Sequence, residues 1–344
     1  MLGAALLASV VPAPARGDVR LPPGFTTHIY VTGQGFDPGR DARGIPAAST
    51  LVFDDAGRLY LGRTGRRYVS VEADDLFPLF RVPLGGGRII AGAESSFLHG
   101  PPLRNPQVTA IRGAGELLVT TFDRERRIGV LYRMVDGRAE LLAGGTPPDG
   151  QQPVLRQPEG VAVAPSGELY VADRDADAVL RLDPRGRILD RRYLAVRRPR
   201  VLAMDPAGTL WIGADGDAEA PWQQGTGEIW CAPREEPPRL VLRGPVPAAL
   251  ALAPGGHLFV ADRHAPEVFV LTRDGRRIPF GTYREGDAPR ALAFAPDTPA
   301  TRQAGIASDL FVVTINLGAW PVNEVVRISG PFESFLRERA AAGP

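Results

Sequence analysis

The chain has 344 residues, of which 44% are hydrophobic, and its formal net charge is only +1. This length allows one or two domains, and the near-neutral charge provides no global field that favours nucleic acid or an anionic membrane. All 40 basic residues are arginine, so mechanisms that need a lysine, including the phosphate-binding P-loop, are excluded. The single cysteine, Cys231, excludes an internal disulfide and multi-cysteine metal sites, and Ile229 and Trp230 before it favour a buried thiol.

The N-terminal segment has the pattern of an export signal. Residues 2–11 are apolar and small, and Ala13-Pro14-Ala15 follows them, which is a short hydrophobic region before a small-x-small cleavage site. The positively charged stretch that usually precedes the apolar run of a signal peptide is missing. The alternative to a signal peptide is an ordinary flexible N-terminus. We therefore predict a signal peptide over residues 1–15 and a periplasmic or secreted protein. No later apolar run reaches the 20 or so residues that a transmembrane helix needs.

From residue 21 onwards the chain repeats one pattern six times. Each copy is an apolar run, a turn with Gly or Asp, and a second apolar run that usually contains an aromatic residue. The turns of the six copies centre on Gly57, Gly115, Gly167, Gly208, Gly256 and Ser308. Two copies align without a gap, because residues 171–187 share nine identities with residues 260–276. The repetition therefore cannot be a product of composition alone.

Each repeat is predicted to contain four short strands. In the third copy these are residues 161–164, 169–172, 178–182 and 188–194, separated by turn residues. No window of 12 residues shows a convincing helical period, which excludes a helical solenoid. Four strands in a unit of about 40–55 residues indicate a propeller blade. We therefore predict an all-β, six-bladed β-propeller of four-stranded antiparallel blades over residues 21–330.

The two ends of the chain are expected to close this ring. The sixth repeat supplies strands at 291–295, 309–315 and 324–328, and residues 25–31 at the N-terminus can add its outer strand. Such a closure removes the exposed edge of an open ring. The C-terminal tail, residues 331–344, can pack as a short helix over 332–342.

Two kinds of known propeller are similar to this sequence. Residues 158–163 (PEGVAV) followed by 167–173 (GELYVAD) resemble NHL repeats, and the fifth copy is similar. Residues 21–25 (LPPGF), 309–313 (DLFVV) and 324–328 (EVVRI) resemble soluble sugar-dehydrogenase-like propellers. The resemblance implies the fold and says little about activity, because NHL modules mostly serve as binding platforms.

The residue just before each inner apolar run is expected to line the channel mouth. Alignment of the six copies places there Ser49, Gln107, Glu159, Arg200, Ala248 and Arg290. The gluconolactonase family resembles this fold and holds a divalent cation with a Glu, Asn and Asp set at those positions. Glu159 matches the Glu, but the other five positions carry no Asn or Asp, and two are arginines, which oppose a cation. We therefore expect no metal and no cofactor.

Four face-loop residues complete the candidate site. Sugar dehydrogenases of this shape use a catalytic histidine and arginines around pyrroloquinoline quinone, and His99 and His264 are expected in loops on the mouth side. Trp222 and Trp320 lie in two inserted loops, where propellers often keep recognition residues. Either tryptophan could equally pack over the base of its loop.

Two further patterns have simpler explanations. The Asp173, Asp175 and Asp177 run lacks the Gly and Glu of a calcium loop, and Asp173 recurs as Asp262, which favours a turn hydrogen bond. The arginine-rich stretch 191–200 alternates with apolar residues and is predicted to be a solvated outer strand that binds no nucleic acid.

These patterns leave two hypotheses about function. The first is an exported, non-catalytic module that binds a protein or glycan partner through Arg200, Arg290, Trp222 and Trp320, with Gln107 and Glu159 beside them. In that case Glu159 either forms a structural ion pair with Arg200 or Arg290 or leaves a surplus arginine for an anion. The alternative is a gluconolactonase-like hydrolase or quinone-dependent dehydrogenase with a changed active site.

Overall fold

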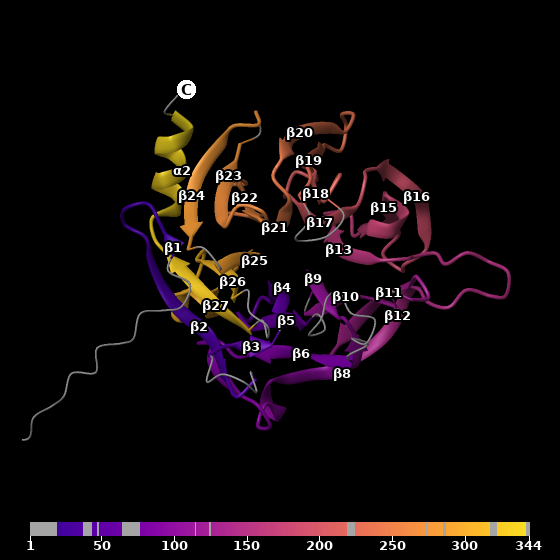
Figure 1. The fold of residues 1–344 in the computed structure, drawn as a ribbon, viewed down its shortest axis with the longest axis horizontal. Coiled ribbons are helices and arrows are strands. Elements are labelled where there is room, and N and C mark those ends of the chain that lie inside the picture. Colours follow the sequence, from indigo (N-terminus) through magenta and orange to yellow (C-terminus); the bar gives the residue numbers. More distant parts are fainter. Residues whose placement is uncertain are drawn as a thin grey trace, which may run out of the picture.

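The computed structural model describes residues 19–36, 43–46, 48–63, 76–113, 115–123, 125–218, 224–272, 274–284, 287–316 and 322–341. Viewed end-on, the strands form six sheets arranged around a central axis (Figure 1). The predicted all-β, six-bladed propeller is confirmed. The predicted signal peptide, residues 1–15, lies outside the described residues.

Four of the blades are sheets of four consecutive antiparallel strands. Blade 2 contains β9 (Gln107–Arg112), β10 (Glu116–Asp123), β11 (Ile128–Val135) and β12 (Arg138–Gly144). Blade 3 contains β13 (Pro158–Val163), β14 (Leu169–Asp173), β15 (Ala178–Leu182) and β16 (Ile188–Ala195), with the short 3-10 helix η2 (Arg174–Ala176). Blade 4 contains β17 (Pro199–Met204), β18 (Leu210–Ala214), β19 (Gly227–Ala232) and β20 (Arg239–Gly244), and blade 5 contains β21 (Pro247–Leu252), β22 (Leu258–Asp262), β23 (Glu267–Leu271) and β24 (Arg277–Tyr283).

Blades 1 and 6 depart from this plan. Blade 1 contains β4 (Ala48–Phe53), β5 (Leu59–Arg63), β6 (Leu76–Val82) and β8 (Leu98–Arg104), and the chain between β6 and β8 makes β7 (Gly87–Ile90) and the 3-10 helix η1 (Ser95–Phe97). Blade 6 contains β25 (Asp287–Phe294), β26 (Leu310–Asn316) and β27 (Val322–Ser329), with α1 (Pro299–Gln303) between the first two.

The first hairpin of blade 3 illustrates how the sequence makes a blade. Its two strands are buried and apolar on the whole, and between them Ala164 N–H donates to Glu168 O at 2.9 Å. Gly167 closes the turn with φ +85°, a conformation that favours glycine. The turn residues therefore fix the register of the hairpin.

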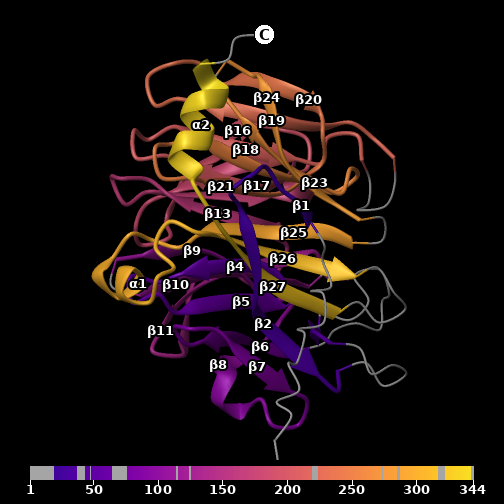
Figure 2. The same cartoon turned by 90° about the vertical axis from the view of Figure 1, so that its left-hand side faces the viewer.

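The innermost strands form the wall of the central channel. β4, β9, β13, β17, β21 and β25 are the first strands of the six blades, and each contacts the next around a closed circle. Apolar side chains fill the space between neighbouring blades; for example, Leu118 and Leu131 of blade 2 pack with Val161 and Leu169 of blade 3. We call the end where the first strands begin, and where second strands lead into third strands, the mouth face. In the side view of Figure 2, α1 marks the opposite face.

The predicted closing strand is present. β2 (Thr26–Gln34) runs antiparallel to β27 and forms the fourth strand of blade 6. Three additions were not predicted: β7 pairs in parallel with the end of β2, β1 (Val19–Arg20) extends blade 5 beside β24, and β3 (Ile45–Pro46) pairs with β27. Blade 1 and the N-terminal segment thus both contribute to the closure of the ring.

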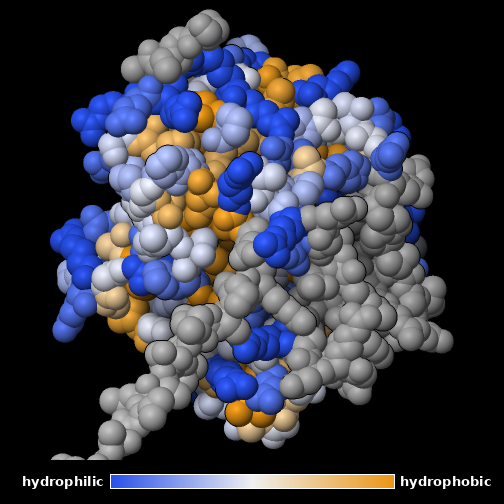
Figure 3. All heavy atoms as spheres, turned by 60° about the vertical axis from the view of Figure 1, so that its left-hand side comes forward, coloured by the Kyte–Doolittle hydropathy of each residue, from blue (hydrophilic) through white to orange (hydrophobic). Residues whose placement is uncertain are grey.

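The predicted C-terminal helix is also present, as α2 (Phe332–Ala341). Its residues Phe332 and Phe335 pack on Phe25 and Phe280 with ring centroids 4.9–5.7 Å apart, so the helix covers the seam between blades 5 and 6. On this side of the disc, hydrophilic residues surround a strip of apolar surface (Figure 3). No helix in the described ranges is long and apolar enough to cross a membrane.

Candidate functional site: the arginine-rich channel mouth

All six residues expected at the channel mouth lie in the innermost strands. Ser49, Gln107, Glu159, Arg200, Ala248 and Arg290 each stand near the start of the first strand of their blade. In every blade except blade 2, the pairing of the first two strands shifts register at this position. A β-bulge of this kind turns a side chain out of the regular alternation, and such bulges are frequent next to binding sites.

Glu159 and Arg200 form a buried ion pair. Their side chains are 1% and 7% exposed, and Arg200 Nε lies 3.0 Å from Glu159 Oε2. The other carboxylate oxygen, Oε1, accepts a hydrogen bond of 2.8 Å from Gln157 Nε2. Gly160 permits this contact, because a Cβ at that position would lie 2.6 Å from Arg200 O. The structural ion pair considered from the sequence is therefore present.

Three further charged residues join this pair, and the sequence alignment of the mouth positions missed them. Arg174, Asp215 and Arg263 come directly after the second strands of blades 3, 4 and 5, respectively. Arg174 Nε lies 3.1 Å from Asp215 Oδ2 and 4.0 Å from Glu159 Oε1. Arg200 Nη1 lies 3.9 Å and Arg263 Nη2 3.5 Å from Asp215. We call these five residues (Glu159, Arg174, Arg200, Asp215 and Arg263) the mouth network.

The same type of backbone hydrogen bond positions each of the three additional residues. The N–H groups of Arg174, Asp215 and Arg263 donate to Gln157 O, Arg198 O and Val246 O at 2.9–3.0 Å, in each case to the residue before the inner strand. The sequence contained a signal for two of them, because Arg174 aligns with Arg263 in one of the nine identities shared by residues 171–187 and 260–276.

Burial is the main influence on the pKa values of Asp215 and Asp173. It raises the pKa of Asp215, although the positive charges of Arg200 and Arg174 act in the opposite direction. Burial also raises the pKa of Asp173, against the hydrogen bonds from Arg156 N at 2.7 Å and Gln157 N at 2.8 Å. Asp262 bonds the equivalent loops of blade 5 through Val246 N and His264 N, so the predicted turn role of these aspartates is confirmed.

The network does not suit a divalent cation. Both oxygens of Glu159 and Oδ2 of Asp215 have donors within 3.1 Å, and two of these donors belong to guanidinium groups, whose charge opposes a metal ion. Within the described ranges, no group of three His, Cys, Asp or Glu residues is arranged as a metal site. The Glu, Asn and Asp set that the gluconolactonase resemblance implies is therefore not reproduced.

The face-loop residues have different outcomes. His264 is exposed in the link between β22 and β23, which lies on the mouth face. The placement of His99 was wrong: it lies in β8, the outermost strand of blade 1, is 8% exposed, and packs against Tyr60 with ring centroids 5.2 Å apart. The insertion of β7 moved this segment out of a loop and into the sheet. Trp222 and Trp320 lie outside the described residues.

Two other expectations agree with the structure. Cys231 is buried at 4% exposure in β19. The basic stretch 191–200 begins in β16, the outermost strand of blade 3, whose central residues are exposed. It ends at Arg200, which belongs to the mouth network. The stretch is therefore partly solvated and partly structural.

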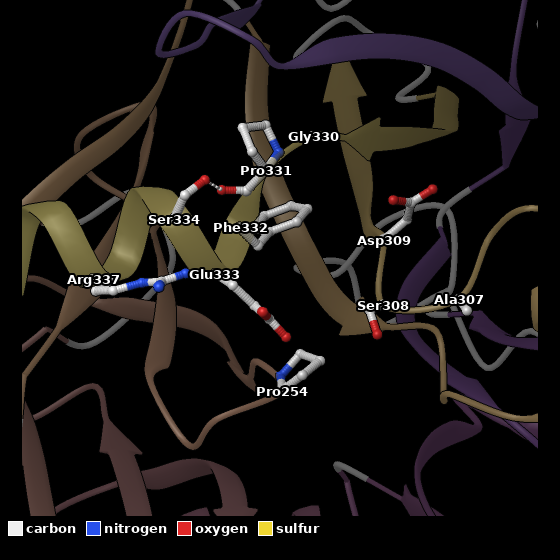
Figure 4. A pocket seen from close by; sticks show the side chains of 10 residues that line it. All are labelled: Pro254, Ala307, Ser308, Asp309, Gly330, Pro331, Phe332, Glu333, Ser334 and Arg337. Carbon is white, nitrogen blue, oxygen red and sulfur yellow. Dashed lines mark hydrogen bonds between the residues drawn. The ribbon is translucent and has the colours of Figure 1, made fainter.

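A separate hollow of about 390 Å3 lies beside α2 on the face opposite the mouth (Figure 4). Pro254, Ser308 and the first turn of α2 line it. Several of its polar groups bond within the protein: Ser334 Oγ donates to Pro331 O at 3.1 Å, and Asp309 Oδ2 accepts from Arg327 and Ser329. It shares no residue with the mouth network.

Comparisons with known proteins support the fold. The NHL repeat model matches residues 155–179, which form the first two strands of blade 3 and their surroundings. No curated protein sequence matches the chain.

Among solved structures, an auxiliary nutrient-binding protein from Bacteroides thetaiotaomicron is similar with a TM-score of 0.59 and 13% identity, over 91% of this chain and 77% of that one. A candidate gluconolactonase is similar with a TM-score of 0.56 and 17% identity, over 90% of this chain and 93% of that one. Virginiamycin B lyase from Staphylococcus aureus is similar with a TM-score of 0.53 and 12% identity, over 91% of this chain and 99% of that one. At these identities the likeness concerns the fold alone. The chain is a six-bladed β-propeller that contains an NHL repeat and resembles the gluconolactonase-like propellers in architecture.

Proposed function

We propose that this chain is an exported, non-catalytic binding module that recognises a protein or glycan partner through the mouth face. The observation that carries the proposal is the mouth network, in which arginines outnumber carboxylates at a buried position on the mouth side of blades 3 to 5. Arginine side chains with fixed geometry suit the recognition of polar and anionic groups. Half-buried Arg290 and exposed His264 add further polar groups around the same mouth.

The chemistry of the network favours binding over turnover. Its carboxylates are engaged by arginines, which keeps them from acting as free bases or metal ligands. Arginine remains protonated and cannot exchange a proton with a substrate at neutral pH. Auxiliary nutrient-binding proteins are among the similar folds, so binding is one use of this architecture. The proposed export rests on the pattern of residues 1–15.

The test is a binding screen of the purified full chain on glycan and peptide arrays. We expect Arg290→Glu and His264→Glu, two changes on the mouth face, to weaken binding by about tenfold through charge repulsion. Arg185→Glu, an exposed residue in the link between β15 and β16 on the opposite face, serves as the matched control and should leave binding within about twofold.

Equal binding by all three variants would contradict the assignment of the face. Hydrolysis of a lactone or oxidation of a sugar by the purified chain would overturn the non-catalytic assignment. N-terminal sequencing of the protein recovered from the periplasm or medium checks export, and a chain that keeps residues 1–15 and stays in the cytoplasm would contradict it.

A further inference from the structure

Arg263 stands out in the mouth network. Its side chain is 6% exposed, yet Nε, Nη1 and Nη2 make no hydrogen bond among the described residues. Its nearest carboxylate oxygen, Oδ1 of Asp215, is 3.5 Å from Nη2 and accepts no hydrogen bond either. A guanidinium group carries five N–H donors, and burying them without acceptors is unfavourable. A site of this kind calls for an acceptor that binds from outside the chain.

The repeat explains why Arg263 has no hydrogen-bonded carboxylate. Arg174 occupies the same position in blade 3, where its Nε donates to Asp215 Oδ2 at 3.1 Å and Glu159 of the inner strand lies 4.0 Å away. In blade 5 the inner-strand position is Ala248, which has no side-chain oxygen. The same arginine position is therefore supplied with an acceptor in blade 3 and left without one in blade 5.

The backbone holds Arg263 at the mouth. Its N–H donates to Val246 O at 2.9 Å, and the adjacent Asp262 carboxylate accepts from His264 N at 2.9 Å and Val246 N at 3.3 Å. These bonds attach the link after β22 to the start of β21. The backbone of Arg263 is thus fixed before any ligand arrives, which lowers the entropy cost of binding.

Charge and shape indicate the class of ligand. The mouth network contains three guanidinium groups and two carboxylates, which leaves one positive charge. A single monoanionic group neutralises it. A carboxylate has the planar, two-oxygen geometry that pairs with two N–H groups of a guanidinium fork.

We propose that Arg263 anchors a carboxylate-binding site at the channel mouth, which accepts one free carboxylate group of a ligand. The inference rests on the proposed binding function and adds the chemical group that the mouth recognises. An acidic sugar and an acidic amino-acid side chain both supply this group, so the experiment has an arm for each.

The experiment is calorimetric titration of the full chain at constant ionic strength. Sodium D-glucuronate, sodium acetate and N-acetylglutamic acid α-amide, whose only carboxylate is that of the side chain, are the probes, and D-glucose is the neutral control. We expect saturable binding of the carboxylates and none of D-glucose, with Arg263→Gln weakening the carboxylates about tenfold or more. Arg263→Lys keeps the positive charge but lacks the planar guanidinium fork, so its affinity for the carboxylates should lie between those of the unmodified chain and Arg263→Gln. Arg185→Gln on the opposite face should bind like the unmodified chain.

The Tm of thermal unfolding distinguishes a binding role of Arg263 from a merely structural one, because only a structural role would lower the Tm of the unliganded variant. Because Arg263 makes no side-chain hydrogen bond, Arg263→Gln should keep the Tm of the unliganded chain. D-glucuronate should raise the Tm of the unmodified chain with concentration and not that of the variant. A failure of Arg263→Gln to fold would count as a sharply lowered Tm and would overturn the proposal.

Three results would overturn the inference. These are carboxylate binding that is the same in Arg263→Gln and the unmodified chain, a Tm that falls sharply in Arg263→Gln, and inorganic phosphate binding as tightly as the carboxylates. The inference fails alone if no carboxylate binds while Arg290→Glu still weakens partner binding. The proposed function fails alone if carboxylates bind through Arg263 while the mouth variants leave every array partner unaffected.

Discussion

Blades 3 to 5 and the ring closure around blade 6 are held together by different interactions. In blades 3 to 5, consecutive strands form regular sheets, and charged side chains cross between blades at the mouth. Around blade 6, strands from distant parts of the chain pair, and α2 covers the seam between blades 5 and 6 with aromatic side chains. The repeated half thus carries the candidate site, whereas the irregular half closes the ring. Substitutions in the two halves should therefore have different signatures.

The largest expected effect is at the seam. Phe332 of α2 is 6% exposed and contacts the rings of Phe25, Phe259, Phe280 and Phe294. Phe332→Ala should lower the free energy of unfolding by about 3–5 kcal/mol, because it removes a buried ring and leaves a cavity. Urea unfolding measures this loss. Leu189→Ala, at a side chain 51% exposed on β16, is the control and should change stability by less than about 0.5 kcal/mol.

A loss below about 1 kcal/mol for Phe332→Ala would mean that α2 contributes little to closure. Closure of the ring would then depend on strand pairing, by β2 with β27 and by the short strands β1, β3 and β7. Binding at the mouth should stay unchanged in folded Phe332→Ala protein, since α2 contains no residue of the mouth network.

The second effect is electrostatic and lies at the mouth. Glu159→Gln removes the negative charge beside buried Arg200, and breaking such a pair on one side should cost about 3 kcal/mol. The double variant Glu159→Gln with Arg200→Met removes both charges and should recover much of that loss. Urea unfolding of the two single variants and the double variant gives the coupling energy. A double variant as unstable as the sum of the two single variants would contradict the ion pair.

The sequence contained most of the fold because hairpins are local. Alternating apolar residues and turns such as the one at Gly167 specify each blade without reference to the rest of the chain. The closing strand was also predictable, since β2 is long and an open ring needs a partner for β27. β1, β3 and β7 were not, because strands of two to four residues carry no period and their partners are far away in sequence.

The candidate site was predictable only in part. Equivalent positions in the repeats identified Glu159 and Arg200, because the start of the first strand always faces the channel. The contacts of Arg174, Asp215 and Arg263 depend on how far each side chain reaches across to the next blade, which no local pattern encodes. The same limit applies to His99, whose burial follows from an inserted strand in blade 1.

The smallest expected effect is on the pH dependence of stability, which has opposite signs at His99 in blade 1 and at Asp215 at the mouth. Burial lowers the pKa of His99 in blade 1, and the charges of Arg81 and Arg58 act in the same direction, against Asp136. A histidine with a lowered folded pKa stabilises the fold above its unfolded pKa of about 6.5, and this contribution is lost as the pH falls. The raised pKa of Asp215 at the mouth has the opposite sign, since its protonation favours the folded state in acid.

His99→Phe keeps a ring against Tyr60 and removes the titrating group. The variant should lose less stability than the unmodified chain between pH 7 and pH 5, as measured by urea midpoints at each pH, while the contribution of Asp215 stays in both proteins. His28→Phe, at an exposed histidine of β2, is the control and should leave the pH profile unchanged. Parallel profiles for His99→Phe and the unmodified chain would show that His99 does not contribute to the pH dependence of stability.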